Sequence, residues 1–158
     1  PNPVNEKAAR VVAGVVMVVA LTTLLASAYW LLIPLAYGFW ARVLTGPTLS
    51  PLGQFVTRVV TPRLAVAPRP VPGPPKRFAQ GIGAVVTVSA AVLHVGFGLT
   101  GAAYVLVAVL AVAASLEAFL GLCVGCRIFA VLMRWGVIPP KVCEACNDLS
   151  LARAGAQP

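Results

Sequence analysis

Four cysteines near the C-terminus are the residues of this sequence with the clearest capacity for chemistry. They form two Cys-x-x-Cys pairs, Cys123 with Cys126 and Cys143 with Cys146. Two such pairs at this spacing fit a four-thiolate zinc site, in which each pair holds the ion from a tight turn. Paired thiols also suit redox exchange or sulfur transfer, and Arg127 beside the first pair would favour its thiolate form. In that case the nucleophile is Cys123 or Cys126, and Cys143 or Cys146 resolves the intermediate.

Both uses of the cysteines require the chain to return on itself after the first pair. Residues 128–134 form a short apolar segment with helical character, and Gly136 and Pro139-Pro140 end it. If the preceding helix continues through the first pair, its two thiols lie one turn apart and face one partner. Thiol exchange, a metal site and inert cysteines all stay open at this level.

Glu117 is the other residue that demands an explanation, because an acid within an apolar span is costly and usually paired or functional. On a continuous helix it points roughly 240° away from Cys123, so the two do not share a face. We expect a structural hydrogen-bond network ahead of proton handling. Its expected partners are Gln80, Arg77 and Arg10.

His94 is the single histidine and lies near the far end of its apolar segment, away from the cysteines in depth. We expect it to pack rather than to bind a cofactor. Small-solute or ion transport is a further alternative function, but its candidate residues, Glu117, Gln80 and His94, lie at different depths.

The composition places these residues in a membrane protein. The chain is 59% hydrophobic and 10% charged, whereas soluble domains are about a quarter charged. Its net charge of +8 could indicate nucleic-acid binding, but the cations flank apolar runs and form no stripe with aromatic residues. We therefore expect a lipid bilayer and no nucleic acid as its surroundings.

Four transmembrane helices are predicted, within one domain that covers residues 1–158. The uncharged run from Val11 to Ala41 is too long for one span, at roughly 46 Å against about 30 Å of hydrocarbon. We divide it near Ala26-Ser27-Ala28. That site also resembles a signal-peptide cleavage site, but the apolar run continues past it. The predicted spans are 9–26, 29–44, 78–97 and 101–122.

The position of the basic residues supports this count. With four spans, every lysine and arginine falls on one side, which the positive-inside rule makes cytoplasmic. Both termini, the loop 45–77 and the cysteine-bearing tail 123–158 then lie in the cytoplasm. The predicted fold class is an all-α, integral membrane four-helix bundle.

The central loop is predicted to hold a short amphipathic helix over 51–61. Ser50 followed by Pro51 is a helix-start signal, and apolar residues then recur at helical spacing. This helix either lies on the inner membrane surface or packs on the bundle. The proline-rich segment 66–75 is expected to be an extended linker.

Three motifs resemble an uncharacterised bacterial membrane family, domain of unknown function 4395. They are Val4-Asn5-Glu6 with Arg10, the run Pro75-Lys76-Arg77-Phe78-Ala79-Gln80-Gly81-Ile82-Gly83, and Glu117 with Gly121-Leu122-Cys123-Val124-Gly125-Cys126. The resemblance covers residues 4 to 148 and implies a bacterial inner (plasma) membrane. It also implies an association with thioredoxin-like or rhodanese-like proteins, and hence thiol or sulfur handling.

Overall fold

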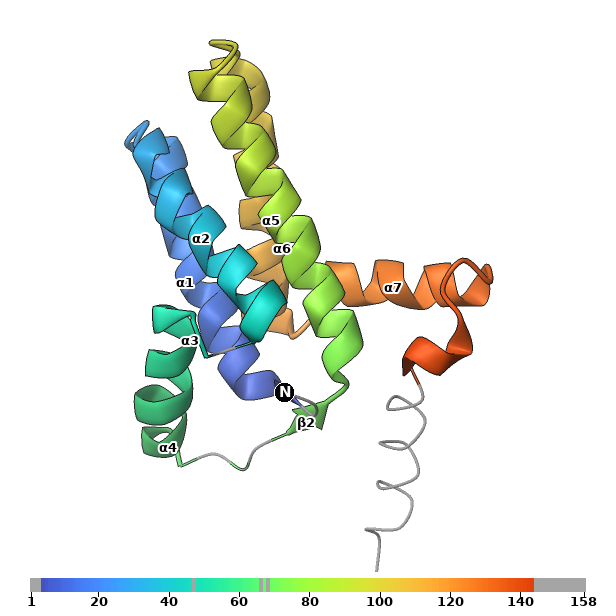
Figure 1. Ribbon diagram of the computed structural model, residues 1–158. Helices are drawn as coiled ribbons and strands as arrows, with labels where there is room; N and C mark the ends of the chain where they lie inside the picture. Colours follow the sequence, from blue (N-terminus) through green and yellow to red (C-terminus); the bar gives the residue numbers. More distant parts are fainter. Residues whose placement is uncertain (1–3, 47, 66, 68, 144–158) are drawn as a thin grey trace, which may run out of the picture.

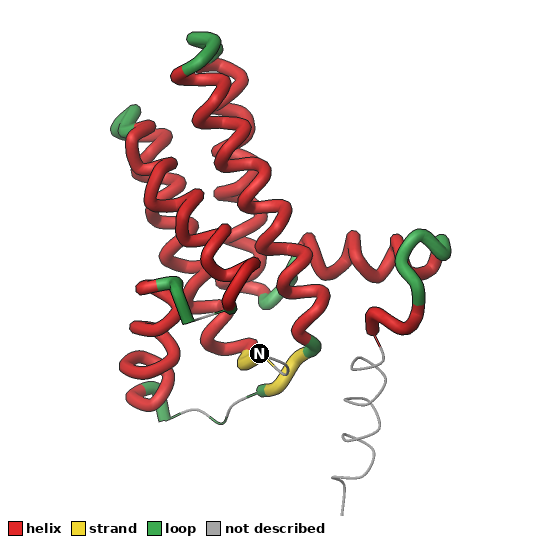
Figure 2. Tube along the Cα trace, viewed as in Figure 1, coloured by secondary structure: helices red, strands yellow, loops and turns green. Residues whose placement is uncertain are grey.

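Among the residues that the structure describes, the protein is all-α apart from one two-residue ladder (Figures 1 and 2). The computed structural model describes residues 4–46, 48–65, 67 and 69–143. The longer helices are α1 (Glu6–Leu25), α2 (Leu32–Thr45), α5 (Gly73–Val95), α6 (Thr100–Leu120) and α7 (Val124–Arg134). The shorter helical elements are η1 (Tyr29–Leu31), α3 (Pro51–Phe55), η2 (Val56–Val60), α4 (Thr61–Arg63) and η3 (Pro140–Cys143). The ladder pairs β1 (Val4–Asn5) with β2 (Pro70–Val71) in antiparallel register.

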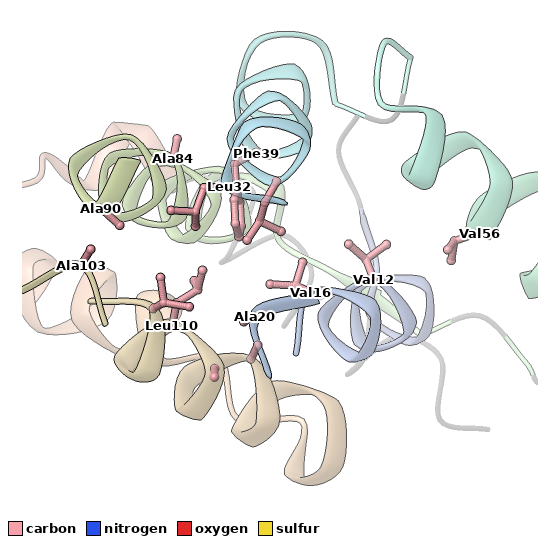
Figure 3. Packing of buried hydrophobic residues seen from close by; sticks show 14 of the residues in the cluster. Val12, Val16, Ala20, Leu32, Phe39, Val56, Ala84, Ala90, Ala103 and Leu110 are labelled. Carbon is pink, nitrogen blue, oxygen red and sulfur yellow. The ribbon is translucent and has the colours of Figure 1, made fainter. Parts of the chain in front are cut away.

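The four helices α1, α2, α5 and α6 pack side by side around a core of small and aliphatic side chains. Helix α1 packs on α6, α6 on α5, and α5 on α2. Figure 3 shows the small members Ala20, Ala84, Ala90 and Ala103 between the helices, beside larger ones such as Leu32. Small residues let helix backbones approach closely, and such packing is the main attraction between helices in lipid.

Three helices, α1, α5 and α6, are long and apolar enough to cross a membrane. Their outward faces are apolar as well: Val105, Val109 and Val112 on α6 are 58–61% exposed. A contiguous apolar outer surface is unfavourable in water and favourable in lipid. Helices of this length and composition are those that the sequence predicted for a membrane protein.

The break in the first apolar run lies at the predicted place. Helix α1 ends at Leu25, Ser27 adopts a positive φ of 52°, and η1 then leads into α2. The start of α5 differs from the prediction, because the helix begins at Gly73 and not at Phe78. Proline is tolerated in the first turn of a helix, so the proline-rich sequence that suggested a linker also starts this helix.

The central loop contains the predicted amphipathic segment, which is helical from Pro51 to Arg63 through α3, η2 and α4. Its N-cap is Ser50, whose Oγ accepts a hydrogen bond from the Gly53 N–H at 3.2 Å. Val56 is buried against α1, whereas Phe55 is 57% exposed. The segment thus packs one edge on the helices and leaves another uncovered.

The two ends of the packed helices differ in character. The short turns around Ser27 and Gly98 lie together at one end (Figure 1). The β1–β2 ladder, the helical segment 51–63 and α7 lie at the other, which we call the basic end (Figure 1). The tertiary structure therefore gathers the cation-bearing loop and the first cysteine pair at the same end.

Gly83 on α5 offers a test of this packing. A Cβ at position 83 would lie 2.4 Å from the Phe39 ring of α2, whereas a Cβ at Gly81 would meet nothing within 4 Å. We expect Gly83→Ala to lower the free energy of unfolding by about 1–3 kcal/mol through overpacking. Reversible unfolding in mixed micelles measures it, with Gly81→Ala as the matched control. Equal stability of the two variants would contradict the packing described here.

Candidate functional site

The chain turns sharply between α6 and the first cysteine pair. Gly121 has a left-handed φ of 67° and its N–H donates to the Glu117 carbonyl at 3.1 Å. The Leu122 N–H donates to the Leu116 carbonyl at 3.1 Å, so two otherwise unpaired carbonyls at the helix end are satisfied. A helix that continues through Cys123, the condition stated above for thiols one turn apart on it, is therefore not formed, and Cys123 begins a new helix instead.

Cys123 is the N-cap of α7. Its φ of −84° and ψ of 105° are extended, and its Sγ accepts a hydrogen bond from the Cys126 N–H at 3.4 Å. The N-terminus of a helix carries partial positive charge and unpaired N–H groups, which favour a thiolate. The Cys-x-x-Cys spacing thus places the first sulfur at the helix end and the second one turn inside the helix.

Gly125 brings this helix end against α5. A Cβ at position 125 would lie 2.5 Å from Ala79 Cβ and 2.6 Å from Ala79 Cα, so a side chain has no room. One turn further along α7, the Phe129 ring meets Phe78 edge to face at 5.5 Å between centroids. Helix α7 then leads away sideways from the packed helices (Figure 1). The close contact of two small residues therefore fixes where the thiols lie.

An ion pair between Lys76 and Glu117 joins α5 to α6 beside the thiols. The two side chains are 12% and 16% exposed. Glu117 has a partner at similar depth, as expected for an acid in an apolar helix, but that partner is Lys76. Lys76 was not among the partners expected from the sequence. Its place four residues before Gln80, on the same face of α5, is the signal that could have identified it.

The other members of the expected polar network have separate partners. Gln80 Oε1 accepts from Arg42 Nε at 2.8 Å. Arg10 donates to the Ala118 carbonyl at 3.2 Å and to the Phe119 carbonyl at 2.7 Å, which satisfies the C-terminal end of α6. Arg77 is exposed at the start of α5. Of the four expected members, Glu117 alone pairs next to the thiols.

Electrostatics distinguish the two thiols. The Cys126 thiol donates a hydrogen bond to Cys123, which lowers the pKa of Cys123 below its ordinary value. Burial and the Glu117 carboxylate act against this, whereas Lys76 and the Cys126 backbone N–H add to it. The same hydrogen bond, together with burial, raises the pKa of Cys126. Arg127, the cation proposed from sequence, is exposed on α7. Of the pair, Cys123 is therefore the thiol that forms a thiolate more readily.

The thiol with the raised pKa, Cys126, is the more accessible of the two. Cys123 is only 8% exposed, whereas Cys126 is partly exposed. Cys123 borders a cavity of about 220 Å³ that α1, α5, α6 and the start of α7 enclose. Glu117 and Gln80 also border this cavity, and its walls are otherwise mostly aliphatic. A large partner can thus reach Cys126 more readily than Cys123.

The chain folds back after α7, as the second cysteine pair requires. Gly136 has a φ of 74°, and the Val137 N–H donates to the Leu132 carbonyl at 3.0 Å. The segment up to η3 then turns back beneath α7 (Figure 2). The Cys143 side chain and Cys146 lie outside the described residues. Among those described, no group of three or more His, Cys, Asp or Glu side chains could hold a metal ion.

His94 lies far from the cysteines, at the opposite end of the packed helices. Its ring stacks on Tyr29 with 4.2 Å between centroids, and its Nδ1 lies 3.2 Å from Thr100 Oγ1. These contacts join α5 to the turn before α2 and to the start of α6. They are those of a packing histidine.

Comparison with known proteins identifies the family. The family model described as "Domain of unknown function (DUF4395)" matches residues 4–134, which include the first cysteine pair and α7. The chain belongs to this family. No curated protein and no solved structure matches it.

The environment of Cys123 predicts the pH dependence of its alkylation. Because the pKa of Cys123 is lowered and that of Cys126 is raised, alkylation of Cys123 should reach half its maximal rate at a lower pH than alkylation of Cys126. Lys76→Met removes a cation that stabilises the thiolate, so the midpoint for Cys123 should move to higher pH. Peptide-resolved mass spectrometry measures both midpoints. The control is Lys141→Met, which removes the same charge from an exposed position. An unchanged midpoint in Lys76→Met would contradict this role of Lys76.

Proposed function

We propose that this member of the family exchanges thiols and disulfides with a partner protein through Cys123 and Cys126. The observation that carries the proposal is the position of Cys123 Sγ at the N-terminus of α7, where the Cys126 N–H donates to it at 3.4 Å. A buried structural cysteine needs no such stabilisation of its thiolate. Lys76, a few residues before the α5 surface that α7 contacts, adds a second stabilising charge.

The two cysteines have different roles in the proposed exchange. Cys126 is the sulfur that the partner reaches, because it is the more exposed of the two. Cys123 is the leaving group when the disulfide is reduced and the attacking sulfur in the reverse sequence, because a stabilised thiolate is the better leaving group. These roles replace the expectation that the second cysteine pair resolves the intermediate, since Cys123 and Cys126 already form a complete pair.

The exchange balances in electrons and protons. A thiolate of the reduced partner attacks Cys126 Sγ of the Cys123–Cys126 disulfide, and Cys123 leaves as a thiolate. The partner's second thiol, once deprotonated, attacks its own sulfur in the mixed disulfide, and Cys126 departs and takes up a proton. The partner is oxidised by two electrons and the Cys-x-x-Cys pair is reduced by two. The reverse sequence transfers the electrons back.

We infer a thioredoxin-like protein as the partner from the family resemblance and from the exchange chemistry. A rhodanese-like partner would use the same access in a different reaction. Its persulfide sulfur would bond to Cys126 Sγ once that thiol has lost its proton, and its own cysteine would leave as a thiolate. Both reactions begin at Cys126, so one set of variants addresses both.

The proposed setting is a bacterial inner membrane with α1, α2, α5 and α6 as four spans and the basic end in the cytoplasm. Helix α2 has 14 residues, and the preceding η1 extends it across the core of the bilayer. The cations of the loop and tail then lie on one side, as the positive-inside rule requires. Helix α7, with exposed Ile128 and Val131 and with Arg127 on its surface, would lie along the inner interface.

A four-cysteine zinc site is the second candidate, with a scaffold role in place of exchange. The reversal of the chain after Gly136 favours it, because the segment up to η3 turns back beneath α7 (Figure 1). Cys123 and Cys126 would supply two of four thiolates. A site of this kind would hold about one zinc ion per chain and would suppress exchange at Cys126.

The two roles predict which variant traps a partner. In Cys123→Ser, a mixed disulfide formed at Cys126 lacks its resolving sulfur, so a complex with an oxidised thioredoxin-like protein should accumulate. In Cys126→Ser the accessible sulfur is gone, and trapping should fall at least about tenfold, as for a buried thiol. Non-reducing electrophoresis with mass spectrometry of the linked peptides measures the complex.

A variant lacking only the second pair, Cys143→Ser with Cys146→Ser, is the matched control and should exchange like the original chain. Trapping through Cys123 in Cys126→Ser, or none in either variant, would contradict the assigned roles. One zinc per chain in the purified protein, lost in the control variant, would instead support the scaffold.

The four-span arrangement predicts the labelling of single introduced cysteines. In a variant whose native cysteines are all serine, Ser27→Cys should react in intact cells with a membrane-impermeant maleimide. Thr61→Cys should react only after the cells are opened, because α2 has returned the chain to the inside. Labelling of both positions in intact cells would show that α2 does not cross.

A further inference from the structure

We propose that Arg42 is the centre of a binding site for a phosphate group, in a second cavity at the basic end. This cavity has a volume of about 400 Å³, and neither Cys123 nor Cys126 borders it. The start of α1, the end of α2, the helical segment 51–63 and the start of α5 enclose it.

Arg42 is a buried cation whose hydrogen bonds are incomplete. The residue is 9% exposed, and its Nε donates to Gln80 Oε1 at 2.8 Å. Its guanidinium lies 4.9 Å from the centroid of the Phe39 ring, which fixes the plane of the group. Its Nη2 is buried and has no hydrogen-bond partner among the described residues. A buried, charged donor without a partner is expensive, so this nitrogen indicates a ligand that the protein itself does not supply.

The lining of the cavity is cationic. Arg42, Lys76 and Arg77 all border it, and no Asp or Glu is among the described residues that do so. The charge of Lys76 is offset by Glu117 on its other side. The two arginines therefore face the cavity without a carboxylate in its wall, and Asn5 and Thr57 add neutral polar groups. An anion with several acceptor oxygens fits this lining.

A phosphate group is the anion that suits an arginine pair best. The planar guanidinium offers parallel N–H donors that match two phosphate oxygens, and an arginine whose orientation is already fixed loses little freedom on binding. The cavity lies at the basic end, at the depth of phospholipid headgroups in the proposed topology. Arg42 also borders an apolar cavity of about 310 Å³ beside α1 and α2, which could take an acyl chain. The phosphate can thus belong to a lipid or be inorganic.

The test uses the purified full chain in a neutral detergent and follows its thermal unfolding. Three probes are added separately: inorganic phosphate, short-chain phosphatidic acid, and short-chain diacylglycerol, with sodium chloride to hold ionic strength constant. A ligand that binds the folded state raises the unfolding midpoint, and above its Kd the rise follows the logarithm of its concentration. We expect phosphatidic acid to raise the midpoint and diacylglycerol to leave it unchanged. A response to inorganic phosphate as well would identify free phosphate as sufficient, whereas a response to phosphatidic acid alone would identify a lipid headgroup.

Variants locate the site. Arg42→Gln should weaken the apparent affinity for the active probe about tenfold or more, as the loss of a charge-assisted hydrogen bond implies. Arg63→Gln is the matched control, because this exposed arginine on the same side does not border the cavity. Arg77→Gln at the exposed edge should weaken binding several-fold, and it decides the question if Arg42→Gln does not fold. No response to either phosphate probe, or affinities in the Arg42 or Arg77 variants equal to that of the control, would overturn the proposal.

Discussion

The buried ion pair between Lys76 and Glu117 is the interaction on which the basic end of the molecule depends. It joins α5 to α6 close to the point where the chain leaves α6 for the cysteines. Bringing two charges out of water is costly, so such a pair adds little net stability, but removing one partner costs about 3–5 kcal/mol. The pair therefore fixes the relative position of two helices and, through opposing charges, sets the potential at Cys123.

Close packing of small residues also positions the packed helices and the thiol site. Lipid offers no hydrophobic force between helices, so contact between their surfaces decides how they assemble. Gly83 accepts the Phe39 ring of α2, and Gly125 accepts Ala79 of α5. The first contact belongs to the packed helices and the second to the thiol site, yet both lie on α5. Helix α5, which carries Lys76, thus also positions helix α2 and the Cys-x-x-Cys pair.

Sequence reasoning succeeded where a long pattern governs the structure and failed where a single contact does. The break after Leu25 followed from the length of the apolar run, and the Ser50 cap followed from its local signal. The start of α5 was misplaced, because prolines are compatible with both a linker and a first helical turn. The span predicted to end at residue 122 ends at Leu120, because Gly121 adopts the left-handed conformation that glycine reaches most readily.

The sequence by itself determined that this is an all-α protein whose apolar helices have the length to cross a membrane, that its basic residues flank the apolar runs, and that its first two cysteines are one helical turn apart. These properties depend on composition and on spacing along the chain, which need no knowledge of distant contacts. Only the tertiary structure decided that Lys76 is the partner of Glu117, that Cys123 caps a helix, and that Arg42 lacks a full set of partners. The ion pair and the surroundings of Arg42 depend on residues from different helices, whose relative depth and rotation are set by side-chain packing, and the Cys123 cap depends on the break in the chain at Gly121.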